Sequence, residues 1–117
     1  MDRYDLVVIG CGPAGEKGAA QAAYFGKKVL VAEREAQPGG AMVHTGTLAS
    51  KTLRESALAI SGLRNRHFGV DLGLGRLPTI EELSFRRVEV ARQESERIRE
   101  NMRRHGVEFV RASGAFL

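Results

Sequence analysis

Three glycines follow a short apolar run near the amino terminus and have the spacing of a dinucleotide-binding turn. The run ends at Ile9, and the glycines are Gly10, Gly12 and Gly15. The first glycine permits a tight turn, the second lets the backbone approach a pyrophosphate, and the third lets a helix pack closely on a sheet. A pyrophosphate there would meet free N–H groups at the positive end of that helix.

An acid occurs where such a site needs one. Glu33 ends a second apolar run, residues 29–32. It lies about 20 residues beyond the glycines, where a carboxylate accepts hydrogen bonds from ribose hydroxyls. Since the expected strand, turn, helix, strand and acid occur in order, the sequence favours a dinucleotide site over a glycine turn that only joins a strand to a helix.

The elements that must position these residues form a βαβ unit. The patterns predict a strand over residues 4–9, a helix from Pro13 to about Phe25 that Gly26 stops, and a strand over 29–32. Because the first strand is nearly all apolar, we expect it to be buried on both faces and central in its sheet. The fold class is therefore α/β, a Rossmann-like parallel sheet with flanking helices, in one domain of 117 residues.

The middle of the chain is less regular. Residues 34–49 have no clear periodicity and form a candidate wall of the ligand site. Ser50 is expected to cap a following helix, and residues 65–78 are expected to form a loop with a short extended piece over 68–72. The apolar side of that helix would carry Leu53, Ala57, Ile60 and Leu63.

The carboxyl-terminal part predicts a long helix and a third strand. Thr79 and Glu82 have capping-box spacing, so a helix should run from there to about His105, stopped by Gly106. Residues 107–110 read as a strand, with Glu108 pointing outward if the strand lies at an edge. The stripe expected to be buried on the helix is Val88, Ala91, Ser95, Ile98 and Met102.

Composition narrows the partners. The chain is 43% hydrophobic and 27% charged, as in ordinary soluble domains. No apolar run approaches the ~20 residues of a transmembrane helix, and no targeting segment begins the chain, so we expect no membrane partner and a cytoplasmic location. The net charge of +4 and pI of about 9.7 raise the question of nucleic acid. Arginines over residues 86–104 alternate with glutamates at helical spacing, which indicates a solvated helix face and no nucleic-acid partner.

Cys11 is the only cysteine, so no intrachain disulfide can form. Within the glycine turn a small buried filler is the expected role, in preference to a reactive thiol.

With the Gly39-Gly40 pair and Ser50-Lys51, these motifs resemble the amino-terminal FAD-binding segment of the pyridine nucleotide-disulfide oxidoreductase flavoproteins. Within this family the chain is most similar to the soluble pyridine nucleotide transhydrogenase branch, which is related to dihydrolipoamide dehydrogenase. The similarity lies in Gly15-Glu16 and in residues 43–47 and 50–54. The resemblance covers all 117 residues and implies an incomplete FAD-binding domain. The resemblance does not include the family's NAD(P)-binding and dimerisation domains, so we expect the chain alone to be inactive. It implies that the intact protein is a homodimer that transfers hydride between NADPH and NAD.

By this resemblance the dinucleotide is FAD, and NAD(P) would bind only a longer form. No catalytic or metal-binding residue is assigned, and His44 is expected to be a loop histidine. Lys51 would stabilise reduced flavin, and a surface lysine in a first helical turn is the alternative. The implied cofactor residues are Gly10, Gly12, Ala14 and Gly15 at the pyrophosphate, Glu33 at the ribose, Gly40, Thr45 and Gly46 toward the isoalloxazine, Lys51 near flavin N5, and Gly114 beside the adenine.

The chain departs from the family pattern at three positions. Met42 and Thr47 stand where disulfide reductases have their two cysteines, and Ala49 replaces the usual proline. A thioether and a hydroxyl cannot replace an attacking thiolate and a resolving sulfur, so a dithiol relay is excluded. Two alternatives stay open: a stand-alone, non-catalytic nucleotide-binding module that self-associates through an exposed sheet edge, and a dihydrolipoamide dehydrogenase-like enzyme without the redox disulfide.

Overall fold

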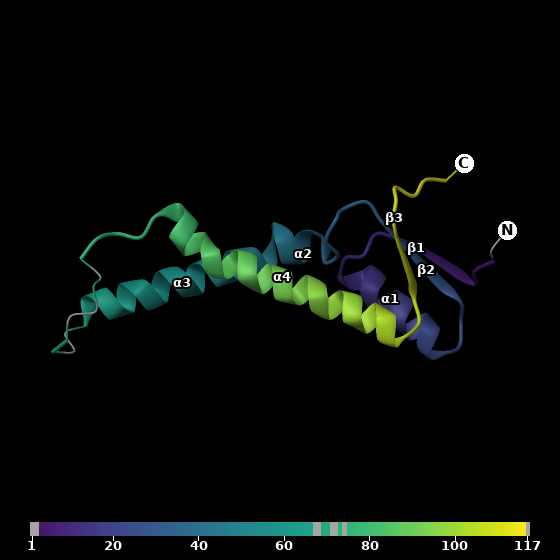
Figure 1. Cartoon of the computed structure of the whole chain (residues 1–117), viewed down its shortest axis with the longest axis horizontal. Helices are drawn as coiled ribbons and strands as arrows, with labels where there is room; N and C mark the ends of the chain where they lie inside the picture. The colour runs from purple at the N-terminus through teal and green to yellow at the C-terminus, as the bar shows by residue number, and fades with distance from the viewer. Residues whose placement is uncertain (1–2, 67–68, 71–72, 74, 117) are drawn as a thin grey trace.

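A three-stranded parallel sheet lies at one end of the molecule, as the computed structural model of residues 3–66, 69–70, 73 and 75–116 shows (Figure 1). The strands are β1 (Leu6–Ile9), β2 (Val29–Glu33) and β3 (Glu108–Arg111), in the order β1-β2-β3. Val8 pairs with Val31, and Val31 pairs with Phe109, so these side chains share one face. The predicted α/β class with a parallel sheet is confirmed.

The prediction that β1 is central is wrong, because β2 lies between β1 and β3. Only the face of Val8 packs against the core, while Val7 and Ile9 on the other face are 53% and 51% exposed. An apolar run indicates that both faces of a strand can be buried, but it does not identify what would cover each face. The outward position of Glu108 on edge strand β3 is confirmed.

Helix α1 (Pro13–Tyr24) joins β1 to β2 and contacts both. Its buried residues include Ala19 and Ala20, whose small side chains let the helix lie close to the strands. The helix ends before Gly26, which has a φ of +78°. Since only glycine adopts this backbone conformation readily, Gly26 is the helix stop that the sequence predicted.

Two helices follow β2 where the sequence predicted one. Helix α2 (Gly40–His44) is too short to leave a periodic pattern, and α3 (Thr47–Asn65) begins before the predicted cap. Gly46 is the N-cap of α3, and the Ser50 hydroxyl donates back to the Gly46 carbonyl over 3.1 Å. The prediction that Ser50 caps this helix is therefore wrong, because its hydroxyl is used inside the first turn.

The predicted apolar side of α3 is also not its buried side. The buried residues are Ala49 and Thr52, whereas Leu53 and Leu63 are 36% and 43% exposed. In Figure 1, α3 and α4 (Ile80–Arg104) run together away from the sheet as a long helical pair, which leaves much of α3 in solvent. The extended piece predicted over residues 68–72 falls largely outside the described residues.

Helix α4 begins with the predicted capping box. The Thr79 hydroxyl accepts a hydrogen bond from Glu82 N, and the Glu82 carboxylate accepts one from Thr79 N. The predicted stripe is buried except at Val88, which is 56% exposed because the first turns of α4 lie along the projecting helical pair. The arginines and glutamates form the predicted pairs at three- and four-residue spacing: Arg92 with Glu89 and Glu96, Arg97 with Glu94, and Glu100 with Arg103 and Arg104.

Candidate functional site

Two glycines of the turn are required by the fold itself. Gly10 has a φ of +93°, a conformation that side chains other than glycine rarely adopt. A Cβ on Gly15 would lie 2.1 Å from the Gly10 carbonyl oxygen, closer than real Cβ contacts allow. Gly15 therefore brings α1 against the end of β1, the role that the glycine pattern predicts for it.

Gly12 is different, because nothing in the fold requires a glycine there. Its φ is −77°, and a Cβ would meet only Gly40 Cα, at an ordinary 4.0 Å. Gly12 caps α1, and the first helical hydrogen bond runs from Glu16 N to Gly12 O at 2.9 Å. The N–H groups of Ala14 and Gly15 precede that bond, so the turn presents backbone donors beside Gly12, where an added Cβ would meet only Gly40.

Glu33 joins the end of β2 to the glycine turn. Its Oε2 accepts a 2.7 Å hydrogen bond from Cys11 N, and its Oε1 accepts a 2.9 Å bond from Glu35 N. Burial by itself would raise the pKa of Glu33, but the hydrogen bonds from the backbone of Glu35, Cys11 and Arg34 outweigh it and lower the pKa. The carboxylate is therefore ionised at neutral pH, although the residue is only 7% exposed.

Two cavities meet at Glu33. The larger has a volume of about 590 Å³ and is bounded by Glu33, the following loop and α2. The smaller has a volume of about 280 Å³ and lies between the glycine turn and the segment after β3. Predicted site residues line both cavities. The larger is lined by Glu33, Gly40 and Thr45, and the smaller is lined by Gly10, Glu33 and Gly114.

The remaining predicted residues lie outside these two cavities. Ala14 is exposed at the start of α1, and Gly46 makes the close turn between α2 and α3, where a Cβ would lie 2.9 Å from the Ala41 carbonyl oxygen. Lys51 is exposed near the start of α3 and lines neither cavity. Its position agrees with the alternative of a surface lysine, and its role toward a flavin stays a prediction.

Gly114 contacts β1 closely. A Cβ there would lie 2.9 Å from Ile9 Cγ1, so a larger residue would displace either the Ile9 side chain or the segment after β3. Because Ala112 N donates to the Glu33 carbonyl oxygen over 3.0 Å, this segment continues past β3 beside the acid. The structure thus brings Gly114 to the same cavity as Glu33, although 81 residues separate them along the chain.

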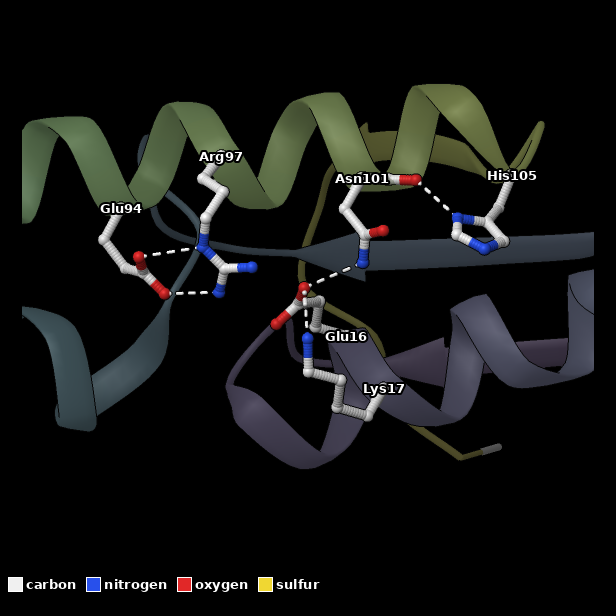
Figure 2. Close-up of polar contacts among 6 residues, drawn as sticks. All are labelled: Glu16, Lys17, Glu94, Arg97, Asn101 and His105. Carbon is white, nitrogen blue, oxygen red and sulfur yellow. Dashed lines mark hydrogen bonds and ion pairs between the residues drawn. The ribbon is translucent and has the colours of Figure 1, made fainter.

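Sequence reasoning missed Glu16 and its partner on α4. Glu16 is 2% exposed and accepts a 2.9 Å hydrogen bond from Asn101 Nδ2 and a 3.0 Å bond from Lys17 Nζ. Figure 2 shows Asn101 reaching from α4 to Glu16, with the ion pair of Glu94 and Arg97 nearby on α4. The signal in the sequence was an acid within a helix of small residues. In the structure, the hydrogen bond between Glu16 and Asn101 holds α4 against the first turns of α1.

The sulfur of Cys11 is not available for chemistry. The residue is fully buried, and burial, followed by the charges of Glu33 and Glu16, raises the pKa of the thiol to about 11. A thiol with this pKa is protonated at neutral pH and is a poor nucleophile. The predicted role of a buried filler is confirmed.

In the described ranges, no helix combines the length and the apolar composition that crossing a membrane requires.

Comparisons with known proteins agree with the sequence resemblance. The family model described as "Pyridine nucleotide-disulphide oxidoreductase" matches residues 4–117. The soluble pyridine nucleotide transhydrogenase of Mycobacterium bovis (strain BCG / Pasteur 1173P2) is 37% identical over the whole chain, which covers 25% of that protein. The transhydrogenase of Hahella chejuensis is 46% identical over 61% of the chain, which corresponds to 15% of that protein.

A solved structure gives the same fold. It is the HOCl-induced flavoprotein disulfide reductase RclA from Escherichia coli, as a Cu(II) complex, with a TM-score of 0.77 and 22% identity over 99% of this chain and 23% of that one. The chain therefore spans about a quarter of the length of the proteins that it matches from end to end. From the family match over residues 4–117, the chain belongs to the pyridine nucleotide-disulphide oxidoreductase family.

Proposed function

We propose that this chain forms the adenosine and pyrophosphate side of an FAD site, in a flavoprotein oxidoreductase whose intact form transfers hydride between NADPH and NAD. Membership of the family implies FAD as the dinucleotide. The relatives named soluble pyridine nucleotide transhydrogenase support hydride transfer between NADPH and NAD as the reaction of the intact protein. Bound FAD would supply hydride transfer at its isoalloxazine ring.

Gly12 carries the proposal. The fold does not require glycine at this position, because its φ is −77° and an added Cβ would lie 4.0 Å from the nearest atom, Gly40 Cα. The close approach of a pyrophosphate to the backbone does require glycine. The N–H groups of Ala14 and Gly15 at the start of α1 are suited to hold the phosphate oxygens. The same turn would thus supply both the donors and the space.

Glu33 is suited to hold the ribose. Backbone N–H groups of Cys11, Arg34 and Glu35 fix its carboxylate, and a carboxylate has about four lone-pair sites, so acceptor capacity remains for ribose hydroxyls. Since its pKa is lowered, it keeps this capacity throughout the neutral range. Gly114 borders the same cavity and would place backbone beside the adenine.

The segment over α2 and the start of α3 favours hydride exchange over disulfide reduction. Met42 and Thr47 occupy the two cysteine positions, so no sulfur pair is present to relay electrons to a disulfide. Lys51 follows on α3, and we propose that it lies near flavin N5 when the flavin is bound. The nicotinamide site and the homodimer contact would belong to the part of the relatives that lies beyond their match to this chain.

A second candidate function is a stand-alone nucleotide-binding module that self-associates. It is favoured by the open face of the sheet, where Val7, Ile9 and Val110 are 53%, 51% and 40% exposed. Apolar surface of this kind favours association with another copy.

Titration of the purified chain with FAD, NAD and ADP, with its mass measured in solution, tests both candidates. If the chain forms half of an FAD site, FAD and ADP should compete for one site, and NAD should bind more weakly than FAD. A folded chain that binds neither FAD nor ADP contradicts the proposal. Tight flavin binding by a monomer counts against a fragment that needs the rest of its fold, and tight binding by an oligomer favours the self-associating module. For the hydride step, a longer flavin-loaded form should reduce an NAD analogue with NADPH, and failure there contradicts the transhydrogenase activity alone.

A further inference from the structure

The carbonyl of Pro38 accepts a buried hydrogen bond from the distant helix α4 and a part-buried one from the neighbouring helix α2. Ser95 Oγ on α4 donates over 2.8 Å, and His44 Nε2 on α2 donates over 3.0 Å. Ser95 and Pro38 are both fully buried, and Ser95 lies 57 residues beyond Pro38 in the chain. The two donors occupy both lone pairs of the carbonyl, which therefore cannot turn away without losing both bonds.

This carbonyl is the end of a hydrogen-bonded chain that reaches the predicted ribose acid. The next residue, Gly39, donates its N–H to the Cys11 carbonyl over 2.8 Å. Cys11 in turn donates its own N–H to Glu33 Oε2 over 2.7 Å. Helix α4 is thus connected through main-chain groups to the acid and to the glycine turn between Gly10 and Gly12.

The segment held in this way needs glycine at both positions. Gly39 and Gly40 have φ values of +123° and +60°, which glycine adopts readily and other residues rarely do. A Cβ on Gly40 would lie 3.0 Å from Gly12 Cα, so the Gly39-Gly40 segment lies directly against the glycine turn. A shift of this segment would change the room beside Gly12 that a pyrophosphate would need.

We propose that Ser95 and His44 are positioning residues of the dinucleotide site, which hold the Pro38 carbonyl and thereby fix the Gly39-Gly40 segment over Gly12. The proposal rests on the proposed function, because it assigns these residues to the same pyrophosphate site. It gives a role to Ser95, the one polar residue in the buried stripe of α4, and it makes His44 a support and not a catalyst.

The test uses variants with and without a donor. Ser95→Ala and His44→Leu remove one donor each, whereas His44→Gln keeps an N–H donor of similar reach. Ser50→Ala is the matched control, since Ser50 is exposed and bonds only to carbonyls of its own helical turn and its cap. Amide hydrogen exchange is measured at Gly39 and at Ala19 in the free chain, and FAD and ADP affinities are measured for each variant.

We expect Gly39 to exchange at least about tenfold faster in Ser95→Ala and His44→Leu while Ala19 is unchanged, because the loss is local. The Kd for FAD and for ADP should rise at least about fivefold in both variants, and His44→Gln should restore both readouts. Ser50→Ala should match the parent chain.

Three results would overturn the proposal: an unchanged Gly39 exchange rate, an equal rise at Gly39 and Ala19, or faster Gly39 exchange with unchanged affinity. If the parent chain binds neither FAD nor ADP, the proposed function fails, and the positioning of the Gly39-Gly40 segment is decided by hydrogen exchange alone.

Discussion

Glu33 Oε2 accepts a 2.7 Å hydrogen bond from the backbone N–H of Cys11, 22 residues earlier in the chain. The bond joins the carboxyl ends of two parallel strands and fixes the glycine turn to the acid. Glu33 also borders both cavities, so the residue that holds the turn together is part of the wall of the proposed ligand site.

Glu33→Gln should make the chain less stable and less sensitive to acid. Gln keeps one acceptor oxygen, so either the buried N–H of Cys11 or the part-buried N–H of Glu35 loses its partner, at a cost of about 1–3 kcal/mol. The folded-state pKa of Glu33 lies below its ordinary value of 4.5, so its contribution is complete above that value and is lost as the pH falls through the folded pKa. Urea unfolding from neutral to acidic pH should therefore show a gap between parent and variant that narrows below about pH 4.5. Glu35→Gln, at the exposed neighbouring acid, is the control. A difference in unfolding free energy between parent and Glu33→Gln that stays constant with pH would contradict a lowered pKa for Glu33.

Gly15→Ala and Gly18→Ala should have opposite effects in the same helix. The new Cβ at position 15 would lie 2.1 Å from the Gly10 carbonyl oxygen, so α1 must move off β1, and we expect a loss of at least about 3 kcal/mol or no folding. At position 18 no atom lies within 4 Å, and Ala should stabilise the chain by about 0.5–1 kcal/mol. Thermal and denaturant unfolding measure both. Equal stabilities for the two variants would show that α1 is not packed as described.

Asn101→Ala should weaken the contact between α4 and α1. It leaves the carboxylate of Glu16, a residue only 2% exposed, without its 2.9 Å bond from Asn101 Nδ2. Loss of one partner of a buried charged group costs about 1–3 kcal/mol. Denaturant unfolding should show this for Asn101→Ala and little change for the exposed Asn65→Ala. In a double-mutant cycle with Glu16→Ala, the two losses should not add, and simple additivity would contradict a direct contact.

Cys11 should react slowly with a thiol reagent in the native chain. It is fully buried with a thiol pKa raised to about 11, so both access and thiolate fraction are low at pH 8. Labelling with a chromogenic disulfide should proceed only on the timescale of opening, and at once in urea. Fast labelling of the folded chain would mean that the glycine turn is open to solvent.

The glycine turn could be predicted from sequence because its causes are local. A positive φ at Gly10 and the close approach at Gly15 are properties of a strand, turn and helix that are contiguous in the chain. The capping box at Thr79 was predictable for the same reason, since donor and acceptor are three residues apart.

What the sequence could not predict depends on contacts between distant segments. The edge position of β1 depends on which strands pair, and the exposure of Leu53 and Leu63 on α3 depends on how far the helical pair projects from the sheet. The contact of Asn101 with Glu16 spans 85 residues and leaves no pattern in the chain. Helix α2 was missed because five residues are too few to show periodicity.

In the proposed FAD site, Gly12 is a glycine because a pyrophosphate approaches its backbone. The most direct test is FAD binding, by flavin fluorescence or calorimetry, to the parent, Gly12→Ala and Gly18→Ala chains. Since a Cβ at position 12 meets only Gly40 Cα at 4.0 Å, Gly12→Ala should unfold within about 1 kcal/mol of the parent and lose at least about tenfold in FAD affinity. Gly18→Ala should bind as the parent does. A folded Gly12→Ala chain with the parent's FAD affinity would contradict this role of Gly12.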